Sequence, residues 1–276
     1  MAQTKRKETE GNGAGPLAGR RVVVTRPAGQ NGGLRALLEG RGAEVLELPL
    51  IRVVAAPDRD AVVEVFAELG SYDWIVFTSA NGVRCFFDIA LRAFEDIRGL
   101  GLLRFACVGG ATAAEVEKFH IKVECRPEVA TAEALAEALV ATGSLDSAKV
   151  ILVTGNLNRD ALARRLEEAR AIVDKLPLYR TERVDAAREH AEALAEFRRR
   201  GADAVLLASA SAAESYAAQA GAPGFFAAGA RRPLVGSIGA ATGGALRRLG
   251  LAVDFEAEEP GLEALAEALG RRLSEG

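Results

Sequence analysis

Short, continuously apolar runs alternate along this chain with longer stretches in which apolar residues recur every three or four positions. Residues 22–25 and 74–77 are runs of the first kind, which is typical of strands buried on both faces of a parallel sheet. Residues 34–42 and 131–140 are stretches of the second kind, which is typical of helices, and Thr131 is placed to cap the latter. The alternation predicts an α/β fold in which doubly wound parallel sheets carry helices on both faces.

The same pattern predicts further elements along the first half of the chain. Strands are expected over "EVLELPLI" (44–51), "RFACVG" (104–109) and "IKVECRP" (121–127), and helices over 58–69, from Gly82 and from Thr112. This order of elements then occurs a second time. Asp73 and Asp203 are 130 positions apart, and so are the two copies of "EALAEAL", which begin at Glu133 and Glu263. We therefore predict two similar α/β domains, each built from one copy of a repeated unit.

Two related segments determine how the chain is divided between these domains. "LPLIRVVAAP" (48–57) and "LPLYRTERVD" (176–185) occupy corresponding places in the two copies. If both are crossover strands between domains, residues 18–52 and 182–276 form a discontinuous first domain, residues 54–178 form the second, and 1–17 are a flexible tail. A division into consecutive halves near Ser147 is the alternative.

Composition and charge exclude several classes of protein. The chain has 276 residues, of which 49% are hydrophobic, and a formal net charge of −3. It has no strongly basic region of the kind that nucleic acid requires and no apolar run approaching the roughly 20 residues of a membrane span. The N-terminal segment is polar and lacks the apolar core of a signal peptide. We expect a cytoplasmic protein that binds neither nucleic acid nor membranes.

Several kinds of catalytic or cofactor site are missing from the sequence. It contains no GxxxxGK[ST] phosphate loop, no GxGxxG at the start of a helix and no GxSxG turn. The three cysteines form no CxxC pair, and with only two histidines they make no zinc spacing. We therefore expect no metal and no nucleotide cofactor.

Polar turns follow many of the predicted strands. In open α/β sheets, ligands bind beyond the carboxyl ends of the strands, where the free N–H groups of helix N-termini attract anions. Six such turns would converge on a cleft between the two domains, which suits a ligand with many negative groups. Ordinary helix capping is the alternative for each turn taken alone. The candidate binding residues are Arg26, Thr78, Ser79, Asn81, Gly109, Thr112, Ser209, Ser211, Gly239 and Thr242.

Two of the candidate side chains carry a specific chemical argument. Arg26 directly follows an apolar strand, where it can pair with a carboxylate or phosphate or can simply be solvated. Tyr179, in the second crossover segment, is one of few groups able to donate a proton to a leaving hydroxyl. The alternative for Tyr179 is packing at the hinge.

The ordered set of motifs resembles the uroporphyrinogen-III synthase family. The resemblance rests on "VVVTRP" (22–27), "YDWIVFTSANGV" (72–83), "RFACVGGATA" (104–113), "LPLYRT" (176–181), "ADAVLLASAS" (202–211) and "VGSIGAATGGALRRLG" (235–250). It spans about residues 18–272 in family order.

This resemblance implies two similar α/β domains joined by two crossover strands, with the active site in the cleft between them. It implies a cofactor-free enzyme that converts the linear tetrapyrrole hydroxymethylbilane to uroporphyrinogen III, with loss of water and inversion of the terminal ring through a spirocyclic intermediate. Tyr179 matches the linker tyrosine, the favoured acid for water loss. The other matches are Arg26, Ser79, Asn81, Thr112, Ser209, Ser211 and Thr242.

The sequence departs from the family pattern at three positions. Ala208 stands where a polar residue often precedes Ser209, and His120 and Arg170 replace usual glycines at turns expected to be left-handed. A bilobal anion-binding or regulatory protein without turnover is the alternative function. A structural protein that docks through its N-terminal tail is a third reading. We expect a monomer, because two internal copies already build a closed cleft.

Overall fold

The computed structural model describes residues 15–158 and 160–275 and divides the chain into two compact units. The continuous unit is Arg52–Glu182, and the discontinuous unit comprises the chain up to Ile51 and from Arg183 onward. Each unit is built on one five-stranded sheet. A division of the chain near Ser147 would separate the hydrogen-bonded strands β4 (Trp74–Phe77) and β6 (Lys149–Gly155).

The sheet of the continuous unit has the strand order β3-β7-β6-β4-β5. The remaining bounds are β3 Ile51–Ala55, β5 Arg104–Cys107 and β7 Ile172–Arg183. Strands β5, β4, β6 and β7 are parallel neighbours, so their carboxyl ends lie along one edge. The chain beyond β3 runs antiparallel to β7, because the N–H groups of Ala56 and Asp58 donate to the carbonyls of Leu178 and Pro177.

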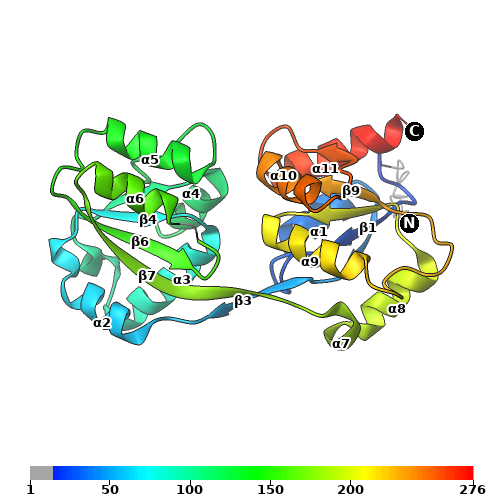
Figure 1. The fold of residues 1–276 in the computed structure, drawn as a ribbon, viewed down its shortest axis with the longest axis horizontal. Helices are drawn as coiled ribbons and strands as arrows, with labels where there is room; N and C mark the ends of the chain where they lie inside the picture. Colours follow the sequence, from blue (N-terminus) through cyan, green and yellow to red (C-terminus); the bar gives the residue numbers. More distant parts are fainter. Residues whose placement is uncertain (1–14, 159, 276) are drawn as a thin grey trace, which may run out of the picture. The chain divides into compact units, whose positions relative to one another are not determined.

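Helices cover both faces of this sheet because successive side chains of a strand point to opposite sides. Ile75 and Phe77 of β4 pack with one group of helices, and Trp74 and Val76 pack with the other. Figure 1 shows the two layers. The first group is α2 (Arg59–Ala67), α3 (Ala80–Ala93) and α4 (Gly110–Glu117), and the second is α5 (Ala132–Ala141) and α6 (Ala161–Glu168). Two short 3₁₀ helices, Leu69–Ser71 and Ile97–Leu100, complete the unit.

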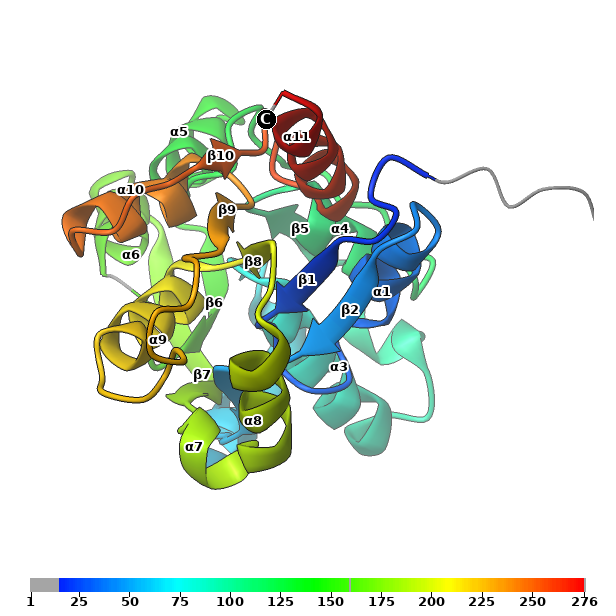
Figure 2. The ribbon, with the colours of Figure 1, turned by 90° about the vertical axis from the view of Figure 1, so that its right-hand side faces the viewer.

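The sheet of the discontinuous unit is parallel throughout, with the order β10-β9-β8-β1-β2. Its strands are β1 Arg21–Val24, β2 Glu44–Glu47, β8 Ala204–Leu207, β9 Leu234–Ser237 and β10 Phe255–Glu256. Val22 and Val24 of β1 pack with α1 (Gly32–Glu39) and α11 (Leu262–Ser274). Figure 2 shows the helices on the two sides of this sheet, and Val23 packs on the other face. The helices there are α7 Ala186–Glu189, α8 Ala191–Arg200, α9 Ala210–Ala220 and α10 Ala240–Arg248.

Most predicted elements are present, and two predicted strands are wrong. The expected strand over residues 44–51 is two strands, because Pro49 has no N–H for a ladder and the chain leaves β2 there before β3 begins at Ile51. The expected strand over residues 121–127 is reduced to a single bridge between Ala106 and Cys125. Pro127 likewise lacks an N–H to extend that pairing.

The helix starts follow their capping residues. Thr131 caps α5 as predicted, since its hydroxyl accepts the Ala134 N–H at 3.1 Å. Helices α3 and α4 begin at Ala80 and Gly110, two residues before the predicted starts, because residues 79 and 109 are the N-caps.

The predicted flexible tail over residues 1–17 extends too far. Leu17 is fully buried in the core shared with α1 and α11, and its N–H donates to the Arg41 carbonyl at 2.9 Å. Leu17 thus buries apolar surface in the core of the discontinuous unit and is part of that unit. Residues 1–14 of the predicted tail lie outside the described residues.

Candidate active site

Three polar turns meet at the carboxyl edge of the sheet in the continuous unit. They follow β5, β4 and β6, and β7 passes alongside them with Tyr179 opposite Gly155 in the register. Because these strands are neighbours, the fold brings together side chains that are up to 100 positions apart in the chain. The candidates Thr78, Ser79, Gly109 and Tyr179 all belong to this edge.

A hydrogen bond joins Tyr179 to Ser79 at this edge. The phenol oxygen lies 2.8 Å from the Ser79 hydroxyl, and that hydroxyl also accepts the Gly82 N–H at 3.1 Å as the N-cap of α3. The Tyr179 side chain is mostly buried, with 8% of the residue exposed. Burial raises the pKa of the Tyr179 phenol, and the hydrogen bond with Ser79 offsets only part of that rise. The phenol therefore stays protonated near neutral pH and can donate a proton.

Two glycines lie beside the tyrosine ring, and one of them makes room for it. A Cβ atom at Gly155 would lie 2.5 Å from the Cε2 and Cζ atoms of Tyr179, closer than real Cβ contacts allow. A Cβ atom at Gly82 would lie 3.1 Å from Val153 Cγ1 and 3.6 Å from Tyr179 Cε1. The register of β6 against β7 shifts between Thr154 and Gly155, which is where the ring crosses the strand. The distance from Gly82 to the ring is an ordinary van der Waals contact, so the position of the phenol depends on the absence of a side chain at residue 155.

The turn after β6 ties the neighbouring turns together. The Asn158 amide donates to Thr78 Oγ1 at 3.1 Å, and its oxygen accepts the Gly155 N–H at 3.3 Å. The Asn156 side chain makes two hydrogen bonds with the backbone of Thr181, at 2.8 Å and 3.2 Å. The sequence predicts a polar turn here but does not single out either asparagine. The sequence signal that could have identified these residues is the presence of two side-chain amides directly after a strand. The predicted turn is "VTGNLNR" (153–159), and its last residue lies outside the described residues.

The other candidates in this unit lie in or beside the helix starts. The Asn81 oxygen accepts a hydrogen bond from Arg84 at 3.0 Å, and Arg84 pairs with Glu115 of α4 at 2.9 Å. Burial alone would raise the pKa of Glu115, but hydrogen bonds from Lys118 and Arg84 outweigh it and lower that pKa. Thr112 is buried in the first turn of α4. The structure thus places Asn81 and Thr112 on adjacent helices at the same edge.

The discontinuous unit has its own carboxyl edge, formed by β1, β8 and β9. Ser209 caps α9 by accepting the Ala212 N–H at 3.1 Å, and its hydroxyl lies 3.1 Å from that of Ser211. Gly239 precedes α10, and Thr242 is buried in the first turn of that helix. Arg26 is half-buried two residues beyond the end of β1. Within this unit, the predicted residues therefore come from three neighbouring strand ends.

The described part of the chain contains no group of three or more His, Cys, Asp or Glu side chains that could hold a metal ion. All three cysteines are free thiols. In the same described ranges, no helix is both long and apolar enough to span a membrane.

The family model for "Uroporphyrinogen-III synthase HemD" matches residues 33–267 of this chain. The chain belongs to the uroporphyrinogen-III synthase family. All the candidate residues except Arg26 lie inside the matched segment.

Two curated members of this family differ in how far they match. A porphyrin biosynthesis protein from Ruminiclostridium josui is 30% identical over 60% of this chain, but the match spans only a third (33%) of the length of that relative. A uroporphyrinogen-III synthase from Chlorobaculum parvum is 24% identical over 91% of this chain and 98% of its own length.

A solved structure extends the likeness to the fold. A mutant uroporphyrinogen III synthase from Thermus thermophilus has 19% identity and a TM-score of 0.62, over 93% of this chain and all of its own. At this identity, the comparison supports the two-domain α/β architecture and nothing finer.

Two of the three departures from the family pattern have a conformational consequence. His120 and Arg170 have φ angles of +59° and +68°, so both adopt the left-handed conformation that the sequence predicts. They lie in the turns that follow α4 and α6, away from the polar turns at the carboxyl edge. Ala208 lies directly before the Ser209 cap, at the carboxyl edge of the discontinuous unit.

Proposed function

We propose that this protein converts hydroxymethylbilane to uroporphyrinogen III, with loss of water and inversion of the terminal pyrrole ring. Family membership supports the reaction, and the hydrogen bond between Tyr179 and Ser79 is the observation that supports a specific role. A protonated phenol at the carboxyl edge of an α/β sheet is a suitable general acid for a leaving hydroxyl.

The hydrogen bonds around Ser79 favour one direction of proton donation. Its oxygen already accepts the Gly82 N–H, so its own proton is available for the Tyr179 oxygen. That arrangement leaves the phenol proton of Tyr179 directed at substrate and stabilises the negative charge that develops on the phenol oxygen as the proton leaves. Ser79 therefore positions Tyr179 and makes it a better acid.

The proposed reaction proceeds in two stages. Tyr179 protonates the terminal hydroxyl of the substrate, the C–O bond breaks, and water departs, which leaves an electrophilic azafulvene once the pyrrole N–H has lost its proton. The far pyrrole ring then attacks through its substituted carbon to give the spirocyclic intermediate, which fragments and recloses with that ring inverted. The main demand on the protein is to hold the chain so that attack at the crowded carbon is favoured, and orientation effects supply up to ~7–11 kcal/mol.

The substrate carboxylates require anion-binding groups. The N-termini of α3 and α4 offer free N–H groups beside Thr78, Ser79 and Thr112. We assign Ser209, Ser211 and Thr242, with Arg26, to the same task at the edge of the discontinuous unit. Gly109 and Gly239 would allow the substrate to approach the backbone closely. Asn81 and Asn158 brace these turns.

The test is product analysis with the full-length protein. Hydroxymethylbilane should yield type III uroporphyrinogen, whereas type I alone would reject the enzyme and favour an anion-binding protein without turnover.

Tyr179→Phe should lower kcat by about 10²-fold or more, because the general acid is lost. Tyr216→Phe is the matched control, since Tyr216 is buried in the other unit among Phe225 and the α9 core. Equal losses in both variants would remove the assigned role of Tyr179.

A further inference from the structure

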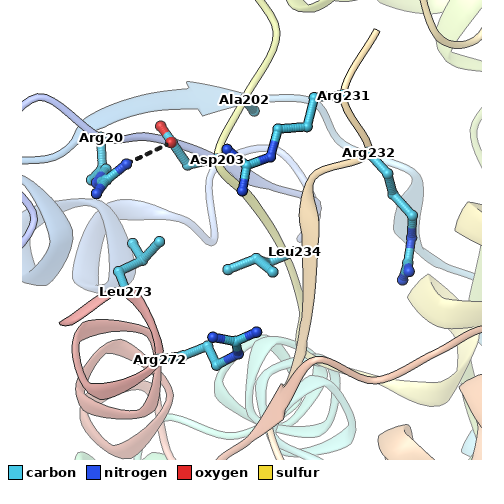
Figure 3. Close-up of a pocket in the computed structure, with 8 residues that line it drawn as sticks. All are labelled: Arg20, Ala202, Asp203, Arg231, Arg232, Leu234, Arg272 and Leu273. Carbon is cyan, nitrogen blue, oxygen red and sulfur yellow. Dashed lines mark hydrogen bonds and ion pairs between the residues drawn. The ribbon is translucent and has the colours of Figure 1, made fainter. Parts of the chain in front are cut away.

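A pocket rich in arginine opens at the amino edge of the sheet in the discontinuous unit, opposite the edge that carries the polar turns. It has a volume of about 220 Å³ and is lined by Arg20, Ala202, Asp203, Arg231, Arg232, Leu234, Arg272 and Leu273. Figure 3 shows Arg20, Arg231 and Arg272 around a floor made by Leu234 and Leu273, with Arg232 turned away. Leu234 begins β9, and the other lining residues precede β1, β8 or β9 or lie in the last turn of α11. Within this unit, the pocket therefore lies at the opposite edge of the sheet from Arg26, Ser209, Ser211 and Thr242.

The arginines of this pocket are incompletely neutralised. Arg20 pairs with Asp203 at 3.2 Å, and Arg232 pairs with Asp254 at 3.2 Å. Asp203 is also occupied by the Arg21 N–H at 2.8 Å. Among the described residues, the guanidinium groups of Arg231 and Arg272 have neither an ion pair nor a hydrogen bond. Like charges held this close without counter-charges favour the binding of an anion.

A second hollow adjoins the pocket and extends the positive surface. It has a volume of about 590 Å³ and shares Ala202, Asp203 and Arg231 with the first. It adds Arg21 and the three arginines that end α8, Arg198–Arg200, so eight arginines and two carboxylates line the two hollows. Arg21 and Arg200 are each paired with Glu44 at 2.7 Å, and the buried Nη1 atom of Arg21 lies 3.9 Å from the Glu196 carboxylate. Among the described residues, Arg198, Arg199 and Arg231 have no carboxylate partner, so these three supply the uncompensated positive charge of the second hollow.

The helix dipole explains part of this pattern and not the rest. Cations in the last turn of a helix are favoured by about 0.3–1 kcal/mol each, which accounts for arginines that end α8 and α11. The helix dipole does not account for Arg231, which lies in a loop. Nor does it explain why arginines from loops and helices line one pocket with an apolar floor. The chain as a whole has a net charge of −3, so the excess of positive charge is local.

We propose that this arginine pocket binds a small polyphosphate anion, of the diphosphate or triphosphate class. Guanidinium groups bind phosphate oxygens in pairs, and several of them around a hollow match a ligand with more than one phosphate. The volume exceeds what a single bound water or ion requires. Leu234, Leu273 and Ala202 provide an apolar surface on which the rest of a nucleotide can lie. The phosphate chain is the shared chemistry, whether it is free or part of a nucleotide.

Isothermal titration calorimetry on the full-length protein tests this site, with tripolyphosphate, ATP and citrate at about 50 mM and about 200 mM NaCl. The wild type should bind tripolyphosphate, with affinity that falls as salt rises. Arg231→Gln/Arg272→Gln should weaken binding at least tenfold. The matched control is Arg59→Gln/Arg188→Gln, which removes two exposed arginines outside both hollows and should weaken binding less than twofold. Thermal melting checks that both double variants fold.

The outcomes separate the possible ligands. Comparable binding of tripolyphosphate and ATP supports a site for the phosphate chain alone, and tighter binding of ATP supports a nucleotide. Absence of binding at about 5 mM tripolyphosphate, equal weakening in the control variant, or tighter binding of citrate would overturn the proposal. So would a single-stranded oligonucleotide that binds more tightly than tripolyphosphate through the same two arginines. Turnover of hydroxymethylbilane is not a readout here, so this test is independent of the proposed function.

Discussion

Burial holds the phenol pKa of all three tyrosines above the ordinary value. For Tyr216 it raises the pKa to about 12. For Tyr72, burial is again the main cause of the raised pKa, and the hydrogen bond to Asp174 adds to it. For Tyr179, the Ser79 hydrogen bond offsets part of the rise in pKa. The three side chains thus resist ionisation in the folded protein, whereas they ionise near pH 10 once the chain unfolds.

The first prediction follows from the sign of these shifts. Because the folded pKa values lie above the unfolded ones, this contribution to stability is complete below the unfolded pKa near 10 and is lost as the pH rises further, for Tyr216 between pH 10 and about 12. In that window, ionisation of Tyr216 in the unfolded chain lowers the free energy of unfolding by up to about 1.4 kcal/mol per pH unit. Urea unfolding at pH 8, 10 and 11 measures the slope. Tyr216→Phe should reduce it, and a slope unchanged by that substitution would contradict the assignment.

The second prediction concerns the left-handed His120. A residue with a Cβ atom costs about 1–2 kcal/mol in this conformation, whereas glycine adopts it freely but loses about 0.5–1 kcal/mol of chain entropy on folding. His120→Gly should therefore raise the free energy of unfolding by about 0.5–1 kcal/mol. Glu117→Gly, at the last helical residue of the same α4, should lower it by a similar amount. Urea denaturation compares the two, and a loss of stability in both would show that His120 makes contacts that outweigh its strain.

At the scale of whole elements, apolar runs predicted strands well wherever turn residues bounded them. The runs at residues 22–25 and 74–77 correspond to β1 and β4. The run at 44–51 failed because its apolar pattern continues across Pro49, and backbone pairing does not. Copies of one element also diverged. The second copy of the repeated unit forms β10, whereas the corresponding part of the first copy forms only a single bridge, between Ala106 and Cys125.

The third prediction belongs to the junction of β6 and β7. Gly155→Ala places a methyl group 2.5 Å from the Tyr179 ring, so the ring must move and its hydrogen bond with Ser79 must lengthen. We expect a loss of about 1–3 kcal/mol in stability, together with a fall in turnover of hydroxymethylbilane. Gly70→Ala is the control, because a Cβ atom there meets nothing within 4 Å. Unfolding curves and initial rates measure both effects. Wild-type rates in Gly155→Ala would show that turnover does not need this placement of the phenol.

At the scale of the molecule, the repeat in the sequence predicted two α/β units, but not every residue that matters in them. Tyr179 and Ser79 were found from their motifs, and their hydrogen bond required the fold to bring them together across 100 positions. Asn158 was missed because a polar turn does not show which of its amides points at a neighbouring strand end. The arginine pocket was missed for a different reason. The chain has a net negative charge, and Arg20, Arg231 and Arg272 are far apart in its sequence. Neither the composition nor the sequence therefore indicates that the fold brings these three arginines together.

The final prediction concerns independent folding of the continuous unit. Its two core clusters draw only on residues within Arg52–Glu182, one around Phe77 and Phe86 and the other around Trp74 and Leu135. It also contains all but the ends of its five-stranded sheet, including β3 and β7. A fragment of residues 52–182 should therefore fold alone and show a cooperative urea transition, measured by circular dichroism.

A fragment of residues 18–147, of nearly equal length, should not fold alone. It lacks β6 and β7 from one sheet and β8, β9 and β10 from the other, which leaves apolar strand faces uncovered. A cooperative transition in the second fragment and none in the first would mean that the chain folds as consecutive halves.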